Sequence, residues 1–115
     1  MFEKIFDDIQ AQNPEIRCIG VWGRDGLVLE KKMYIENPTD LELLGAQIAD
    51  ITSKFDNIKT TSQGYNLKID IGDSLLMVFS LTQDYFMVVL TNQEAILGKL
   101  AFYVDANKNK LSSLL

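Results

Sequence analysis

Histidine is absent from this 115-residue sequence, and cysteine occurs only once. Without histidine the chain lacks the commonest general base and the commonest zinc ligand. The single cysteine, Cys18, excludes an internal disulfide and is typical of a protein of the reducing cytoplasm. We therefore expect a protein that is not an enzyme and that binds neither a cofactor nor a metal ion.

Basic residues are also few, and long apolar runs are missing. The chain has eleven lysines and arginines and sixteen acidic residues, so its net charge is −5. A negative net charge argues against a nucleic-acid or anionic-membrane partner. The apolar runs at residues 75–81 and 85–90 are far shorter than the roughly 20 residues that span a bilayer. Residues 1–8 carry acids where a signal peptide needs a basic end. We expect a cytoplasmic protein without membrane insertion.

The composition is otherwise that of a folded protein. Hydrophobic residues make up 47% of the chain and charged residues 23%, too apolar for a disordered sequence. A chain of this length buries a core without help from metal or disulfides. We expect residues 1–115 to form a single domain.

Hydrophobic periodicity divides the chain into helices and strands. Helical spacing marks residues 2–12, 40–55 and 92–111. Alternating or continuous apolar runs predict strands at residues 16–23, 27–32, 66–71, 75–81 and 85–90. The predicted fold class is mixed α/β (α+β), a five-stranded antiparallel sheet covered by three helices in the order α-β-β-α-β-β-β-α.

Three local signals fix the expected turns and helix starts. Asp25-Gly26 predicts a tight turn in the first hairpin. Thr39, with Glu42 three positions on, forms a capping box for the second helix. Asn92 is the expected N-cap of the last helix, with Glu94 in its first turn.

The second helix has one broad apolar stripe. It consists of Leu41, Leu44, Gly45, Ile48, Ile51, Thr52 and Phe55. Gly45 lies inside the stripe, where the missing side chain allows the helix to lie close to the sheet. A lone helix about 10–12 Å across cannot cover a sheet some 19 Å or more wide, so we expect a second copy of the chain to cover the rest of that face.

The residues that could carry chemistry have ordinary structural explanations. Cys18 lies in the middle of a strand with no histidine to activate it. The glycines at 20, 23 and 26 have the wrong spacing for dinucleotide binding and fit a strand and a turn. Arg24 could act as an arginine finger on a partner's phosphoryl group, but an arginine beside Asp-Gly more often solvates a turn.

Leu43 and Ala46 are apolar residues on the polar side of the second helix. The remainder of that side is polar or charged and includes Glu42, Gln47, Asp50 and Lys54. A large apolar residue in such surroundings favours an interface over a plain solvated face.

The order of elements, with Asp25-Gly26 in the first hairpin and Leu97-Gly98 early in the last helix, resembles the roadblock / dynein light chain superfamily. The similarity extends over roughly residues 2–111, and the bacterial MglB-like branch is the one that this chain matches best in size. The segment Thr91-Asn92-Gln93-Glu94 departs from the small-residue helix entry of that family.

The resemblance implies a homodimer in which the strands near residues 66–71 pair edge to edge into one ten-stranded sheet, with the two second helices together over one face. It also implies a non-enzymatic binding platform for a small Ras-like GTPase, in some members GTPase-activating. We assign the dimer interface to Leu43, Ala46, Asp50, Leu67, Ile69 and Ile71. We assign the GTPase-binding surface to Glu42, Leu43, Gln47 and Lys54.

Other functions remain open at this point. The chain could be an assembly scaffold for a motor or a membrane-associated complex, with no effect on nucleotide turnover. It could also be a small-ligand sensor domain, because a sheet covered by helices can hold a pocket. A longin or profilin-like module is the fold most easily confused with the one predicted.

Overall fold

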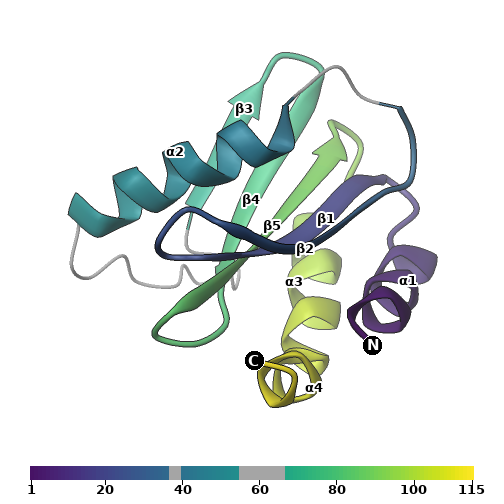
Figure 1. Cartoon of the computed structure of the whole chain (residues 1–115). Coiled ribbons are helices and arrows are strands. Elements are labelled where there is room, and N and C mark those ends of the chain that lie inside the picture. Colours follow the sequence, from purple (N-terminus) through teal and green to yellow (C-terminus); the bar gives the residue numbers. More distant parts are fainter. Residues whose placement is uncertain (37–39, 55–66) are drawn as a thin grey trace.

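The computed structural model describes residues 1–36, 40–54 and 67–115, with the backbone alone at residues 41 and 52–54. Its elements form three layers, with a sheet between two layers of helices (Figure 1). In chain order they are α1 (Phe2–Gln12), β1 (Ile16–Gly23), β2 (Val28–Met33), α2 (Leu41–Lys54), β3 (Leu67–Ile71), β4 (Ser74–Ser80), β5 (Tyr85–Asn92), α3 (Leu97–Ala106) and α4 (Lys108–Ser113). The predicted fold class and element order are confirmed, with one extra short helix at the end.

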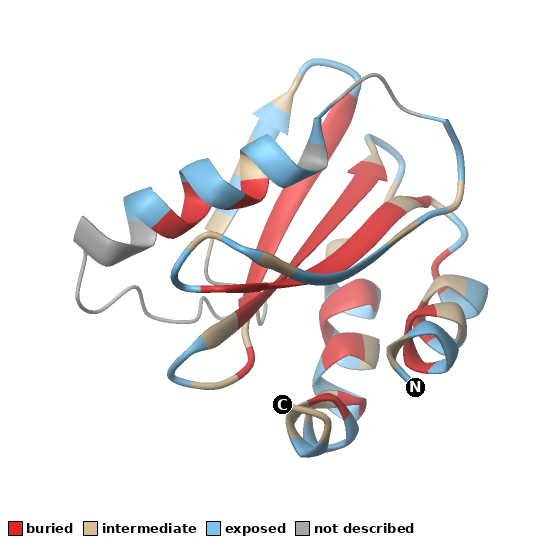
Figure 2. Ribbon diagram, viewed as in Figure 1, coloured by how far each residue is buried: buried red, intermediate tan, exposed pale blue. Residues whose placement is uncertain are grey.

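The sheet is antiparallel and has the strand order β2-β1-β5-β4-β3. The three strands in its middle are buried along almost their whole length, whereas β2 and β3 are partly exposed (Figure 2). Two of the three hairpin turns contain a glycine with positive φ, 89° at Gly26 between β1 and β2 and 65° at Gly72 between β3 and β4. Side chains rarely adopt this conformation, so glycine at these positions allows the chain to reverse direction.

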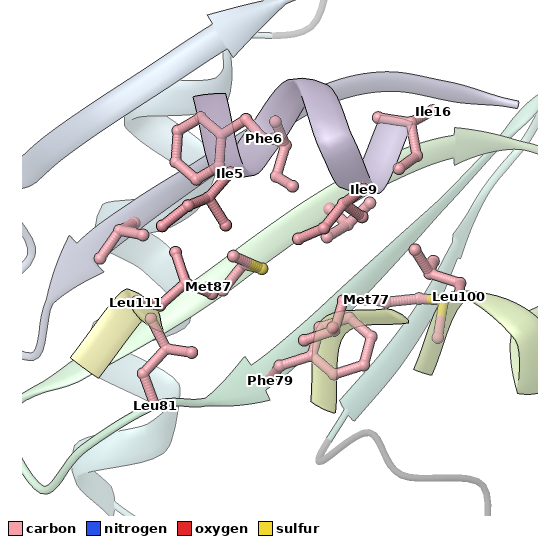
Figure 3. Packing of buried hydrophobic residues seen from close by; sticks show 14 of the residues in the cluster. Ile5, Phe6, Ile9, Ile16, Met77, Phe79, Leu81, Met87, Leu100 and Leu111 are labelled. Carbon is pink, nitrogen blue, oxygen red and sulfur yellow. The ribbon is translucent and has the colours of Figure 1, made fainter. Parts of the chain in front are cut away.

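One face of the sheet packs against α1, α3 and α4. Phe6 and Ile9 from α1 share one buried cluster with Leu100 from α3, Leu111 from α4 and the sheet residue Met87 (Figure 3). All five side chains are buried almost completely. At roughly 25 cal/mol for each Å² of apolar surface removed from water, this layer supplies a large share of the folding free energy.

The other face packs against α2, and its centre is Trp22. The indole is fully buried on β1, and a Cβ at Gly45 would lie 2.1 Å from its Nε1 atom. A Cβ at Gly20 would likewise lie 2.6 Å from the ring. Two glycines therefore make room for one tryptophan, and the prediction that Gly45 brings the helix close to the sheet is confirmed.

The predicted start of the last helix was wrong, whereas that of the second helix is within one residue of the prediction. Asp40 caps α2, because its Oδ1 accepts a hydrogen bond from the backbone N–H of Leu43 at 3.1 Å, whereas Thr39 lies outside the described residues. Asn92 belongs to β5, where it is opposite Ser74, and α3 begins only at Leu97. The Asn92 side chain instead accepts a hydrogen bond from the N–H of Glu94, in a turn between strand and helix.

The last helix is also interrupted. Asn107 separates α3 from α4, and its side-chain amide donates to the carbonyl of Tyr103 at 2.8 Å. An asparagine that competes for a backbone carbonyl four residues back favours such a break. Leu111 is buried beyond the break, so the predicted apolar stripe continues into α4.

Candidate functional site

Strand β3 forms one edge of the sheet and pairs only with β4 among the described residues. Its apolar residues Leu67, Ile69 and Ile71 are half-buried and alternate with the exposed Lys68 and Asp70. The three apolar side chains pack at the margin of the α2-side core. An edge strand with such residues presents both unpaired backbone groups and apolar surface to a partner.

Side chains from distant parts of the chain hold the turn between β3 and β4. The Gln93 side-chain amide donates to Asp70 Oδ1 and to the Gly72 carbonyl, both at 2.9 Å, and lies 3.2 Å from the Ser74 carbonyl. Arg17 donates to Ser74 Oγ at 2.8 Å. Sequence reasoning missed this role of Gln93, although the departure from the family pattern at residues 91–94 pointed to the segment.

The outer side of α2 carries the rest of the predicted surface. Leu43 is 56% exposed, and Ala46 and Gln47 are exposed beside it. The tip of the first hairpin reaches this helix, because a Cβ at Gly26 would lie 3.7 Å from that of Ala46. The outer side of α2 and the hairpin tip therefore form one continuous surface.

Three charged residues of α2 belong to the predicted surface. Glu42 forms an exposed ion pair with Lys31 of β2, at 3.0 Å between Oε1 and Nζ. Asp50 is exposed. Lys54 ends the helix, and its side chain lies outside the described part of the chain.

The apolar stripe of α2 is rotated slightly from the predicted one. Ala49 is buried, whereas Ile51 is 40% exposed. Leu44 is half-buried at the margin of the same core cluster that β3 borders. The predicted dimer residues of β3 and Leu44 of α2 thus border one core cluster, and Leu43 and Ile51 of α2 are exposed. The expectation that α2 alone does not cover the sheet is consistent with this.

Arg24 lies at the tip of the first hairpin and is exposed. Its guanidinium donates to Ser80 Oγ at 3.2 Å, and its backbone N–H donates to the Asp84 carbonyl at 2.9 Å. The arginine therefore connects two neighbouring hairpin ends, which favours its interpretation as a turn residue. It also borders an open hollow of about 540 Å³ that Leu27 and Tyr85 help to line.

The ionisable groups with displaced pKa values are Cys18, buried in the core beneath α2, and three groups on the opposite face of the sheet. Burial raises the pKa of the Cys18 thiol to about 12, so the cysteine is a buried structural residue. On the opposite face Asp7 accepts hydrogen bonds from Lys32 at 2.8 Å and from the Tyr34 hydroxyl at 2.7 Å. The bond from Lys32, and then that from Tyr34, lowers the pKa of Asp7. Burial is the main cause that raises the pKa of Tyr34.

Metal-binding and membrane-spanning features are both missing from the described residues. They contain no group of three or more cysteine or acidic side chains placed to hold a metal ion. None of their helices has the length and apolar character needed to cross a bilayer.

No protein-family model and no curated protein matches this sequence. Solved structures do match it. The gliding protein MglB from Thermus thermophilus is similar with a TM-score of 0.78 at 16% identity, covering 97% of this chain and 86% of that one. A Roadblock/LC7 domain from Streptomyces avermitilis has a TM-score of 0.71 at 22% identity, over 96% of this chain and 97% of that one.

A profilin, which has the fold expected to be most easily confused with this one, is also similar. Profilin IA from Acanthamoeba castellanii matches at 14% identity over 99% of this chain and 98% of its own length. Its TM-score, 0.62, is lower than those of MglB and the Roadblock/LC7 domain. The better superposition on MglB and on the Roadblock/LC7 domain decides between the two. The chain therefore has the roadblock/LC7 fold, in the form seen in MglB.

Proposed function

We propose that the protein is a homodimeric, non-enzymatic regulator of a small Ras-like GTPase. The observation that carries this proposal is the edge strand β3, whose apolar residues are only half-buried and which pairs with β4 alone among the described residues. A roadblock-type dimer would cover this edge, and the family resemblance assigns regulation of such GTPases to dimers of that kind.

The first step is pairing of β3 with β3 of a second copy. Leu67, Ile69 and Ile71 are half-buried at the free edge, so a second edge would remove their remaining apolar surface from water. Gln93 and Arg17 fix the turn at the end of this strand, so little conformational entropy is lost when the edge pairs. A preformed edge therefore favours association.

The second step brings the two α2 helices together. Leu43, 56% exposed, would supply an apolar anchor for the GTPase, and Glu42, Gln47 and Lys54 would form a polar rim that sets its orientation. Two symmetric copies of this surface on one face leave room for a single partner, which gives a two-to-one complex.

Any activation would act through the GTPase's own residues. Arg24, the hairpin-tip candidate for an inserted arginine, is held by Ser80 and Asp84 on the neighbouring hairpin. The dimer would therefore position the partner's switch residues around the nucleotide, without donating a catalytic group of its own.

Sedimentation equilibrium of Ile69→Lys tests the dimer. The wild type should be dimeric at tens of micromolar, and a charge at the free edge should make the variant monomeric. Ile96→Lys, which places the same charge at the exposed start of α3, is the matched control and should remain dimeric. A monomeric wild type, or a dimeric Ile69→Lys variant with native circular dichroism, would refute this dimer.

Nucleotide turnover tests the regulatory role. The small Ras-like GTPases of the native host are purified, and GTP hydrolysis is measured with and without the dimer. Faster hydrolysis by one of them indicates an activating protein. Binding without any change in hydrolysis indicates the scaffold alternative, and the absence of binding to all of them would refute the proposal.

A further inference from the structure

A small hollow lies between helices α1 and α4, on the face of the sheet opposite α2. The two helices pack against each other there (Figure 1). The hollow has a volume of about 300 Å³, at the lower end of the range of small-ligand pockets. Because residues three or four apart lie on the same side of a helix, the lining residues of each helix form one wall. They are Met1, Lys4, Ile5 and Asp8 at α1, and Lys110, Ser113 and Leu114 at α4.

The apolar part of the lining comes from both walls. Ile5 belongs to the core of the helical layer, and Leu114 packs against the same core. Met1, at the start of α1, is 87% exposed beside them. A hydrocarbon group in the hollow would remove this apolar surface from water, which is favourable in proportion to the area covered.

Each wall also carries a lysine that is available to an anion. Lys4 and Lys110 are exposed and take part in no ion pair within the described part of the chain, whereas Lys31 and Lys32 are paired. Two lysines and the single aspartate, Asp8, give the lining a net charge of +1. Since salt at 0.1 M limits charge interactions to about 10 Å, these nearby lysines outweigh the distant acidic residues for a small anion.

We propose that this hollow binds a free carboxylate with a hydrocarbon chain of medium length, such as octanoate. The chain lies against Ile5 and Leu114, and the carboxylate accepts hydrogen bonds from the ammonium groups of Lys4 and Lys110. The net charge of −5 opposes adsorption to an anionic bilayer, so the ligand is an acid in solution and not a membrane lipid.

This ligand site is separate from the surface assigned to the GTPase. It lies on the helical layer of α1, α3 and α4, whereas the GTPase surface is on α2 across the sheet. Its test therefore needs only the chain and the acid, and its result does not depend on the GTPase.

Titration calorimetry with acids of increasing chain length tests the apolar part of the site. Octanoate should bind with one molecule for each chain, and each methylene added from hexanoate to octanoate should raise the affinity about fourfold. The uncharged 1-octanol and the cationic octylamine, which have the same hydrocarbon chain, should bind at least tenfold more weakly. No binding of octanoate, or equal binding of 1-octanol, would overturn the proposal.

Charge variants test the two lysines, one on each wall. Lys110→Glu and Lys4→Glu should each weaken octanoate binding about tenfold, and Asp8→Asn should tighten it about two- to threefold because it removes a like charge. Lys99→Glu makes the same charge change on an exposed residue of α3 that does not line the hollow, so it should bind like the wild type. Wild-type affinity in both lysine variants, or equal weakening by Lys99→Glu, would refute the assignment.

Methyl NMR and vesicle sedimentation locate the ligand and identify its source. Octanoate should shift the methyl signals of Ile5 and Leu114 and leave those of Ile69 on β3 unchanged. Shifts that omit Ile5 and Leu114 would place the acid elsewhere and overturn this site. The protein should stay in the supernatant when vesicles of phosphatidylglycerol are pelleted. Sedimentation with the vesicles that Lys110→Glu abolishes would overturn the assignment to a free acid in favour of a membrane lipid.

Discussion

Replacing Gly45 by alanine is the sharpest test of how α2 is seated on the sheet. The added Cβ would lie 2.1 Å from Trp22 Nε1 and 2.3 Å from the adjacent ring carbon Cε2, closer than any real contact. The indole is fully buried beneath the helix and has no room to rotate away. Either the helix must move out from the sheet or the tryptophan must leave its rotamer.

The expected cost follows from two opposing effects. Overpacking a filled core costs about 1–3 kcal/mol, and the better helix propensity of alanine returns up to about 1 kcal/mol. The net loss is about 1–2 kcal/mol of the free energy of unfolding. Gly98→Ala is the matched control, because a Cβ there meets nothing within 4 Å. That variant should keep or slightly raise the stability of the wild type.

Urea unfolding followed by tryptophan fluorescence measures both variants at the relevant place, since Trp22 is the only tryptophan. Gly45→Ala should lower the urea midpoint and shift the emission maximum of the native protein. Gly98→Ala should not lower the midpoint and should not shift the emission maximum. If Gly45→Ala is as stable as Gly98→Ala, with unchanged native emission, the close seating of α2 on Trp22 is wrong.

Three further predictions concern single side chains. Cys18, whose pKa burial raises to about 12, should react with a thiol reagent only after unfolding, and rapid labelling of native protein would contradict its burial. Asp7, whose pKa the Lys32 hydrogen bond lowers, should stabilise the fold above its ordinary pKa of 3.8 and lose that effect as the pH falls below it. Melting temperatures from pH 7 to 3 should therefore depend less on pH in Asp7→Asn than in the control Asp8→Asn, and equal slopes would refute the role of Asp7. Gln93→Ala should speed hydrogen exchange of the β3 amides and leave the exchange of the β1 amides unchanged. Equal protection of β3 in the variant and the wild type would refute the role of Gln93 in holding the turn between β3 and β4.

The element order could be predicted because local patterns and tertiary contacts agree along most of the chain. The alternation at residues 67–71 is that of a half-buried edge strand, and β3 is such a strand. Gly45 stands out in the sequence as a small residue inside an apolar stripe, and a large buried ring is its reason. Residue type and environment point to the same structure at these positions.

The errors arise where two local solutions have similar free energies. Thr39 and Asp40 are both good N-caps by residue type, and Asp40 accepts the capping hydrogen bond from the N–H of Leu43. Asn92 is a good N-cap in sequence, but its N–H bonds to the Glu15 carbonyl and it pairs with Ser74, so the sheet continues through it. Long-range pairing of this kind overrides local propensity.

Contacts between residues far apart in sequence could not be predicted at all. Gln93 reaches Asp70 across 23 positions, and Lys32 reaches Asp7 across 25. No spacing rule within one helix or strand relates such residues. These contacts fix one edge strand to its turn and the other to α1, so they also decide which surfaces are open for partners.

Binding of the host's small Ras-like GTPase to wild-type protein and to Leu43→Arg tests the central claim most directly. Titration calorimetry with the GTPase loaded with a non-hydrolysable GTP analogue should give one GTPase for each two copies of this chain. Leu43→Arg should weaken binding by about 2 kcal/mol or more, roughly 30-fold, with an unchanged melting temperature. Equal affinity of the two proteins, or a Leu43→Arg variant that unfolds, would contradict the assignment of this helix surface to the GTPase.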